Sequence, residues 1–322
     1  MKKKTTVVIL IAITILFVLF FKTPLNNFLH SKTHSQALKS NKVSKDVNNK
    51  QIDYFTLFYA LKSQKLIDQS ININHIAYKV KEEPLLLKDK TLVDVYFYVK
   101  TMNLLEKQVY SKREIIKYVN SLQTEDGSFS IDPNTIGESD LKTSILPTKM
   151  AIEIYEDLNA EIPNNKKLNI WLTRSAKSLE NFDESNYVSY GSYLYMLKEI
   201  SNKLNLSGSE ELNSYLEASL SNLQPLFLTN KTKITVEEIY TATQINLFFK
   251  NKQISMDKRF IESFMESIQL KDGSFPLYGI KGRSPDITTT YLAVSSTKHL
   301  KVSIARQYQL KHYLQKELQE SL

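Results

Sequence analysis

The chain has 322 residues, of which 24% are charged and 42% hydrophobic, and it contains no cysteine. Disulfide bonds, a thiolate nucleophile and a cysteine-ligated zinc ion are therefore excluded. The formal net charge is +8, but residues 1–22 hold four lysines and no acidic residue, which leaves 38 basic against 34 acidic residues in the remainder. So small a surplus does not indicate a nucleic-acid-binding protein, and no nucleic-acid partner is expected.

The N-terminal segment has the pattern of a membrane anchor. Lys2, Lys3 and Lys4 precede an uncharged run, residues 5–21, that is rich in valine, isoleucine, leucine and phenylalanine. The run approaches the length that crosses a bilayer, and the lysines favour a cytoplasmic N-terminus. No small-residue cleavage site follows it directly, so an uncleaved signal-anchor is favoured over a cleaved signal peptide. We expect residues 1–22 to form one transmembrane helix of a cell-membrane protein whose bulk is extracytoplasmic.

The remainder divides into a linker and one domain. Residues 23–50 are polar, rich in asparagine, serine and lysine, and without apolar periodicity, which predicts a flexible linker. The whole chain holds only seven glycines and eight prolines. Helical spacing of apolar residues is frequent after residue 50, so residues 51–322 are predicted to be an all-α domain.

Helices are predicted in chain order from this spacing. They cover residues 54–61, 92–105, 112–123, a segment starting near Asp140, and then 168–179, 188–204, 212–223, 236–249, 259–269, 286–300 and 303–318. Most form pairs, and the first helices of successive pairs end at intervals of roughly fifty residues, which is typical of repeat proteins. Because no helix pair buries its apolar face alone, the pairs are expected to stack.

Two copies of one sequence motif support the prediction of a repeat protein. Residues 118–129 read YVNSLQTEDGSF and residues 264–275 read FMESIQLKDGSF, 146 residues later, with six of twelve positions identical. The same offset matches Asp140 to Asp286. Asp-Gly after a helix supplies a residue that tolerates positive φ, the phenylalanine can fold back under the helix pair, and the glutamine can bond the loop backbone. A structural role is therefore predicted for the turn residues Gln123, Asp126, Gly127, Phe129, Gln269, Asp272, Gly273 and Phe275.

The motif Gln-x-x-Asp-Gly-Ser-Phe, followed by (Ser/Pro)-Asp-x-x-Thr-x-Tyr, resembles the repeat of the prenyltransferase β-subunit and squalene–hopene cyclase superfamily. Residues 264–294 carry the best match and residues 118–155 the second best. The resemblance implies an α/α toroid, with an outer and an inner ring of helices around a central cavity. It also implies that the helix after each glycine turn belongs to the inner ring, so that Asp140 and Asp286 would open inner helices at one mouth.

The catalytic groups of that superfamily do not carry over. Protein prenyltransferases hold zinc with Asp, Cys and His, but Thr289 stands where the histidine would be, and the chain has no cysteine. The Asp-x-Asp-Asp motif of the cyclases and the Cys-Gly-Glu-Gln segment of complement-type thioester domains are also absent. These departures argue against the named reactions and not against the fold. Neither a metal nor a cofactor is expected.

Asp140 and Asp286 are the candidate catalytic residues. Helix capping by these carboxylates is the favoured interpretation, because an aspartate at a helix N-terminus satisfies free N–H groups. The alternative is a pair of carboxylates facing across one mouth, as glycoside hydrolysis requires. The candidate ligand-binding residues are Asp140, Asp286, Tyr291, Tyr190 and Tyr240, because aromatic walls can bind cations, sugars or apolar ligands.

Two functions remain open at this point. The first is a non-catalytic, membrane-anchored toroid that binds an apolar or polymeric cell-envelope ligand (a lipid or a glycan) or a partner protein. The second is an enzyme that acts on a glycan, as a hydrolase or lyase, or on a terpenoid, as a cyclase or prenyltransferase-like protein. The lining of the ring discriminates between ligands, because several acidic groups favour a glycan whereas a purely aromatic lining favours a terpenoid or lipid.

Overall fold

A computed structural model describes residues 52–68, 74–81, 83–135, 141–206, 208–280 and 282–322. The chain divides into two units, Met1–Lys50 and Gln51–Leu322, and all of the described residues belong to the second. The expected anchor (1–22), the expected linker (23–50) and Asp140 lie outside the described residues. Within the described ranges, no helix is both long enough and apolar enough to cross a membrane.

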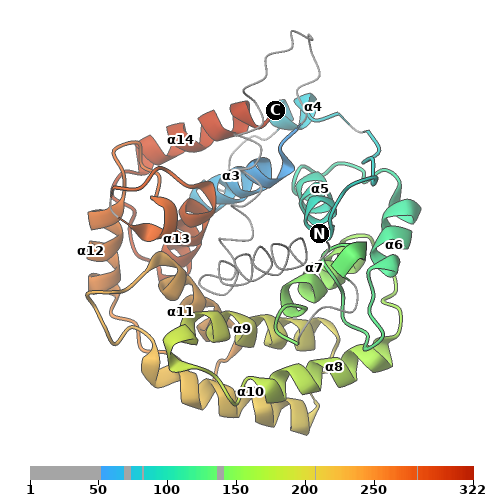
Figure 1. The fold of residues 1–322 in the computed structure, drawn as a ribbon. Coiled ribbons are helices and arrows are strands. Elements are labelled where there is room, and N and C mark those ends of the chain that lie inside the picture. The colour runs from blue at the N-terminus through green and yellow to red at the C-terminus, as the bar shows by residue number, and fades with distance from the viewer. Residues whose placement is uncertain (1–51, 69–73, 82, 136–140, 207, 281) are drawn as a thin grey trace, which may run out of the picture. The chain divides into compact units, whose positions relative to one another are not determined.

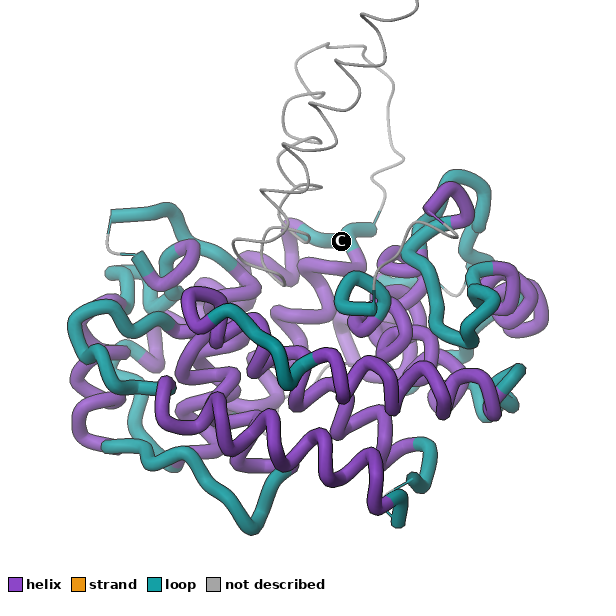
Figure 2. Tube along the Cα trace, turned by 60° about the horizontal axis from the view of Figure 1, so that its bottom comes forward, coloured by secondary structure: helices purple, strands orange, loops and turns teal. Residues whose placement is uncertain are grey.

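The described residues form twelve α-helices, and inner and outer helices alternate along the chain (Figure 1). The inner helices are α3 (Tyr54–Ile67), α5 (Leu92–Leu104), α7 (Ile145–Asp157), α9 (Tyr187–Lys203), α11 (Val236–Phe248) and α13 (Ile287–Leu300). The outer helices are α4 (Asn74–Lys79), α6 (Lys112–Ser121), α8 (Asn165–Ser178), α10 (Glu210–Leu223), α12 (Lys258–Ile268) and α14 (Gln307–Glu320). Figure 2 shows only helices and loops in this part of the chain.

The inner ring is closed. Each inner helix packs against the next inner helix along the chain, and α13, the last, packs against α3, the first. The outer helix α14 also packs against α3, so the end of the domain returns to its beginning. The predicted all-α toroid is therefore confirmed for the part of the chain that the structure describes.

The distribution of apolar residues explains which helices lie inside. In α13 every residue from Ile287 to Thr297 is buried, because the helix has neighbours on all sides. In α12, by contrast, only Ile261, Met265 and Ile268 are buried, along one stripe. A helix with one apolar stripe covers a core from outside, whereas a helix that is apolar around most of its circumference lies within it.

The two Asp-Gly turns follow the outer helices α6 and α12 and pack closely against the next outer helices, α8 and α14. Gly127 has φ +93° and Gly273 has φ +85°, in the left-handed region that side chains other than glycine rarely adopt. A Cβ on Gly127 would lie 2.4 Å from the backbone nitrogen of Leu168 in α8, and one on Gly273 would lie 2.1 Å from that of Leu310 in α14. Only glycine lets the two backbones approach this closely.

Polar side chains close the same turns in both copies. The Gln123 amide donates to the Gly127 carbonyl at 3.0 Å, and the Gln269 amide donates to the Gly273 carbonyl at 2.7 Å. Within the turns, Asp126 Oδ1 accepts from the Ser128 N–H at 3.1 Å and Asp272 Oδ1 accepts from the Ser274 N–H at 3.0 Å. Phe129 and Phe275 are fully buried beneath these turns.

Two features of the helix prediction need correction. The short helix α4 was not predicted, because its six residues bury only Ile76 and show no apolar period. The helix after the first turn was expected to open near Asp140, but α7 begins at Ile145 and its N-cap is Ser144. Between the Asp-Gly turn and the inner helix, the first copy has four more residues than the second. An offset of 146 residues therefore no longer matches equivalent residues after the turn.

Candidate functional site

The six inner helices each contribute one residue at an equivalent position, counted back from the end of the helix. These residues lie eight positions before the last residue of their helix, or nine in α13, and they are Tyr59, Tyr96, Lys149, Tyr195, Tyr240 and Tyr291. We call this set the tyrosine belt. Lys149 is its one member that is not a tyrosine.

Ring contacts connect four belt residues along one side of the ring. The ring centroids of Tyr59 and Tyr291 lie 5.2 Å apart, those of Tyr291 and Tyr240 lie 6.3 Å apart, and those of Tyr240 and Tyr195 lie 6.4 Å apart. Separations in this range are typical of interacting aromatic pairs. The four tyrosines therefore form a continuous aromatic strip from α3 to α9.

Belt residues on different inner helices influence one another electrostatically. Burial is the main cause that raises the pKa of Tyr59, but Lys149 on α7 and Tyr195 on α9 also act on it. These helices lie two and three places from α3 in the inner ring.

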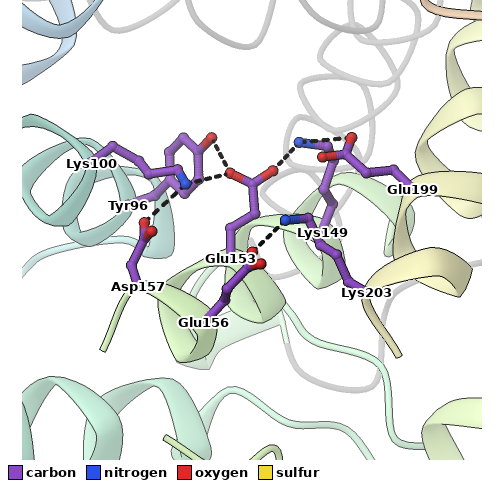
Figure 3. Close-up of polar contacts among 8 residues, drawn as sticks. All are labelled: Tyr96, Lys100, Lys149, Glu153, Glu156, Asp157, Glu199 and Lys203. Atoms are coloured by element: carbon purple, nitrogen blue, oxygen red, sulfur yellow. Dashed lines mark hydrogen bonds and ion pairs between the residues drawn. The ribbon is translucent and has the colours of Figure 1, made fainter. Parts of the chain in front are cut away.

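An ion network on α5, α7 and α9 includes the belt residue Lys149 (Figure 3). Lys100 Nζ lies 2.9 Å from Glu153 Oε2 and 2.9 Å from Asp157 Oδ2. Lys149 pairs with Glu153, and its Nζ lies 3.3 Å from Glu199 Oε2. We call Lys100, Lys149, Glu153, Asp157 and Glu199 the ion network.

The network fixes the charge state of its central carboxylate. Burial works to raise the pKa of Glu153, but Lys149 and Lys100 outweigh it and hold the pKa well below its usual range. Burial likewise works to lower the pKa of Lys149, and Glu153 and Glu199 outweigh it. The Tyr96 hydroxyl donates to Glu153 Oε2 at 2.9 Å, which joins the belt to the network. Both ions of the central pair are therefore charged at neutral pH.

Glu237 has the opposite electrostatic environment. It lies three residues before Tyr240 on α11, and burial alone raises its pKa to about 7. Among the described residues, its Oε1 atom is buried without a hydrogen-bond partner, and so is the hydroxyl of Thr288, three residues before Tyr291. A carboxyl group in this state carries a proton part of the time at neutral pH.

The predicted site residues fall into different places. Tyr240 and Tyr291 lie together in the tyrosine belt, whereas Tyr190 packs against Phe182 and Tyr193 and its hydroxyl accepts from Lys142 Nζ at 2.6 Å. Asp286 caps α13: its Oδ1 accepts from the Thr289 N–H at 2.6 Å.

The second copy of the motif supplies an aspartate where the first supplies a serine. The Thr290 N–H donates to the Asp286 carbonyl at 2.9 Å, and the Thr148 N–H donates to the Ser144 carbonyl at 3.0 Å. Ser144 is therefore the structural counterpart of Asp286, and Asp140, which lies outside the described residues, is not. Whether the Asp140 and Asp286 carboxylates face each other, as the hydrolase alternative requires, stays a prediction.

Comparison with protein families agrees with this architecture. A family model described as the prenyltransferase alpha-alpha toroid domain matches residues 28–159 and, again, residues 74–319. The chain belongs to this family. The two matches overlap over residues 74–159, as a repeated helix pair allows. No curated protein gives a significant match, and neither does any solved structure.

The zinc chemistry of some toroid proteins does not fit the residues of this toroid. Thr289 stands in place of a histidine ligand, and the Asp286 carboxylate accepts the backbone N–H of Thr289. No cysteine is present in the chain. In the described ranges, no three histidine, aspartate or glutamate side chains gather as metal ligands do.

Sequence reasoning missed most of the belt and the whole ion network. The missed residues are Tyr59, Tyr96, Lys149, Tyr195, Lys100, Glu153, Asp157 and Glu199. A signal was present: Tyr96/Lys100, Lys149/Glu153 and Tyr195/Glu199 are all spaced by four residues, which places each pair on one face of a helix. Their equivalence appears only when residues are counted back from the end of each inner helix.

Proposed function

We propose that this toroid is a membrane-anchored, extracytoplasmic protein that binds a cell-envelope glycan inside its ring without transforming it. The observation that carries the proposal is the tyrosine belt, with five tyrosines at equivalent positions of six inner helices. Tyrosine offers a flat apolar face and a hydroxyl on one side chain. Sugar rings present the same combination of apolar faces and hydroxyl groups.

Charges beside the belt favour a glycan over a hydrocarbon. The ion network brings three carboxylates, Glu153, Asp157 and Glu199, to the inner wall. Covering such groups with a lipid or terpenoid would remove water from them without supplying hydrogen bonds, which is costly. Sugar hydroxyls can donate to carboxylates and accept from lysines, and so can replace that water.

Ion pairing supports a binding role over catalysis. Glu153 is kept ionised by two lysines, so it has no proton to donate to a leaving group. Glu199 pairs with Lys149. The reactive groups of the prenyltransferases and cyclases are missing from the chain as well. The expected anchor at residues 1–22 supports an extracytoplasmic position, where a cell-envelope glycan is available.

Calorimetric titration of the full-length chain in nanodiscs tests the proposal. The probes are chitohexaose, as a glycan, and farnesol, as an apolar ligand. We expect chitohexaose to bind, and Tyr240→Ala combined with Tyr291→Ala to weaken binding by about 5- to 150-fold, since each lost aromatic contact is worth about 0.5–1.5 kcal/mol. Tyr308→Ala is the matched control, because Tyr308 lies on α14 and is 72% exposed. Binding of farnesol alone would overturn the glycan proposal.

Glu237 favours one second candidate, a glycan hydrolase. A carboxyl group with a raised pKa next to an ionised carboxylate is the division of labour that glycosidases use. Here Glu237, whose pKa burial raises to about 7, would be the acid, and Glu199, which pairs with Lys149, would be the second carboxylate. Release of reducing ends from chitohexaose by the wild type, abolished in Glu237→Gln, would establish this candidate in place of simple binding.

A further inference from the structure

A second candidate site lies away from the tyrosine belt. A pocket of about 260 Å³ opens between α9, α10 and the segment that follows α11. Its apolar lining includes Leu216, Leu220 and Phe248. The Phe248 ring stacks on Tyr195, with 6.4 Å between centroids and 5° between planes, so Phe248 stands between this pocket and the belt.

The pocket carries an excess of positive charge. Lys198, Lys250 and Lys252 line it, against one carboxylate, Glu217. Lys252 Nζ lies 4.0 Å from Glu217 Oε2, so this carboxylate is already shared with the lysine at the rim. The charged side chains of the lining therefore carry a net charge of +2.

Lys198 is the cation best placed to meet a ligand. Its ammonium group donates to the neutral Asn213 Oδ1 at 2.8 Å and lies 5.9 Å from the centroid of the Phe249 ring. Burial lowers the pKa of Lys198, and Glu217 offsets this only in part. A partly desolvated ammonium group with an uncharged hydrogen-bond partner gains from the arrival of an anion.

The walls of the pocket are held in place before any ligand arrives. The Asn246 side chain donates to the Ile254 carbonyl at 2.9 Å and accepts from the Ile254 N–H at 2.7 Å. The Gln224 amide donates to the Gln253 carbonyl at 2.7 Å. These bonds fix the segment that carries Lys250 and Lys252. A preformed pocket loses little conformational entropy when it binds a ligand.

We propose that this pocket binds a small aromatic carboxylate, with its ring against Phe248 and the two leucines and its carboxylate on Lys198. The volume suits a single-ring molecule, since pockets for drug-sized ligands range from about 300 to 1,000 Å³. This site is independent of the glycan proposal, because it uses none of the belt or network side chains.

The experiment compares benzoate with benzamide, its neutral isostere, by calorimetric titration of the full-length chain. Benzoate is expected to bind at least about tenfold more tightly than benzamide. Lys198→Met, which keeps the apolar stem and removes the charge, is expected to abolish that preference. Lys166→Met, at an exposed position on α8, is the matched control and is expected to bind benzoate as the wild type does.

Three results would overturn the proposal. Equal affinity for benzoate and benzamide would show that the charge of the ligand does not contribute to binding. Unchanged benzoate binding in Lys198→Met would show that this lysine does not hold the carboxylate. Absence of benzoate binding at millimolar concentration would show that the pocket is not a site for an aromatic carboxylate. Thermal melting of each variant, monitored by circular dichroism, identifies a variant that has lost its fold. If Lys198→Met does not fold, Lys250→Met, at an exposed position, is titrated instead. This variant is also expected to bind benzoate more weakly than the wild type does.

Discussion

The backbone N–H of Phe275 donates a hydrogen bond of 3.0 Å to the hydroxyl of Thr290. The first copy of the motif repeats this bond at the same length, from Phe129 to Thr148. Each bond ties a buried turn to the first turn of the following inner helix. It also shows that Thr148 is the counterpart of Thr290. The sequence offset of 146 residues would instead match Thr290 to Ser144, four residues earlier.

Removal of this hydroxyl is expected to destabilise the fold. Thr290→Val keeps the shape of the side chain but leaves the Phe275 N–H buried without an acceptor, which costs about 1–3 kcal/mol. Thr148→Val is expected to cost a similar amount. Thr173→Val, on the outer helix α8, is the control and is expected to change stability by less than about 0.5 kcal/mol. Urea unfolding measures all three, and equal midpoints would contradict this role of the bond.

The turn glycines are expected to tolerate no side chain. Gly273→Ala would place a Cβ 2.1 Å from the backbone nitrogen of Leu310 at a φ of +85°. The positive φ costs about 1–2 kcal/mol, and movement of α14 adds to it, so we expect a loss of about 3 kcal/mol or more in unfolding free energy. Gly208→Ala is the control, because no atom lies within 4 Å of the position that a Cβ would take there. Similar melting temperatures for the two variants would show that the turn does not press against α14.

Lys149 is expected to be the critical member of the ion network. Lys149→Met leaves Glu153 and Glu199 close together without their shared cation, and breaking a buried pair in this way costs about 3–5 kcal/mol. Lys203→Met breaks the pair with Glu156, whose side chain is 57% exposed, and should cost less than about 1 kcal/mol. Chemical denaturation of both variants gives the comparison. Adding Glu153→Gln to Lys149→Met should recover part of the loss.

Two carboxyl groups are expected to act on stability in opposite directions as pH changes. The pKa of Glu153 is lowered in the fold, so its stabilising contribution is present above its usual pKa of 4.5 and is lost as the pH falls. The pKa of Glu237 is raised from 4.5 to about 7, so the folded chain holds a proton that the unfolded chain has released. Stability contributed by that proton is present below pH 4.5 and is lost as the pH rises through 7.

Glu237→Gln isolates the second effect. At pH 8 the variant is expected to be more stable than the wild type by up to about 3 kcal/mol, because a shift of one pKa unit corresponds to about 1.4 kcal/mol. At pH 4 the two should be equally stable. Glu114→Gln, at an exposed position on α6, is the control and should follow the wild type at both pH values. A difference between Glu237→Gln and wild type that does not depend on pH would contradict the raised pKa.

Local chemistry explains why much of the fold could be predicted from sequence. The residues of the turns act within a few positions of each other, as in the bond from Gln269 to Gly273, and such patterns are visible without a structure. Outer helices such as α12 carry one apolar stripe, which gives them a clear period. The inner helices were recognised as apolar segments, and α7 was placed four residues too early because Asp140 looked like its N-cap.

The interior of the ring could not be predicted in the same way. Tyr59 and Tyr291 are 232 positions apart and meet because α13 closes the ring on α3. Sequence alone gave Tyr240 and Tyr291 as candidates but no reason to join them to Tyr59 or Tyr195. Lys149 and Glu153 have the spacing of an ordinary surface pair, and only their burial between α5 and α9 distinguishes them.

The most direct measurement of the central claim is a crystal structure of the full-length chain with bound chitohexaose. The glycan account predicts sugar rings inside the ring of helices, in contact with Tyr195, Tyr240 and Tyr291. It also predicts hydroxyl groups within hydrogen-bond distance of the ion network. Sugar bound only on the outer helices, or a hydrocarbon chain in contact with the belt, would contradict it.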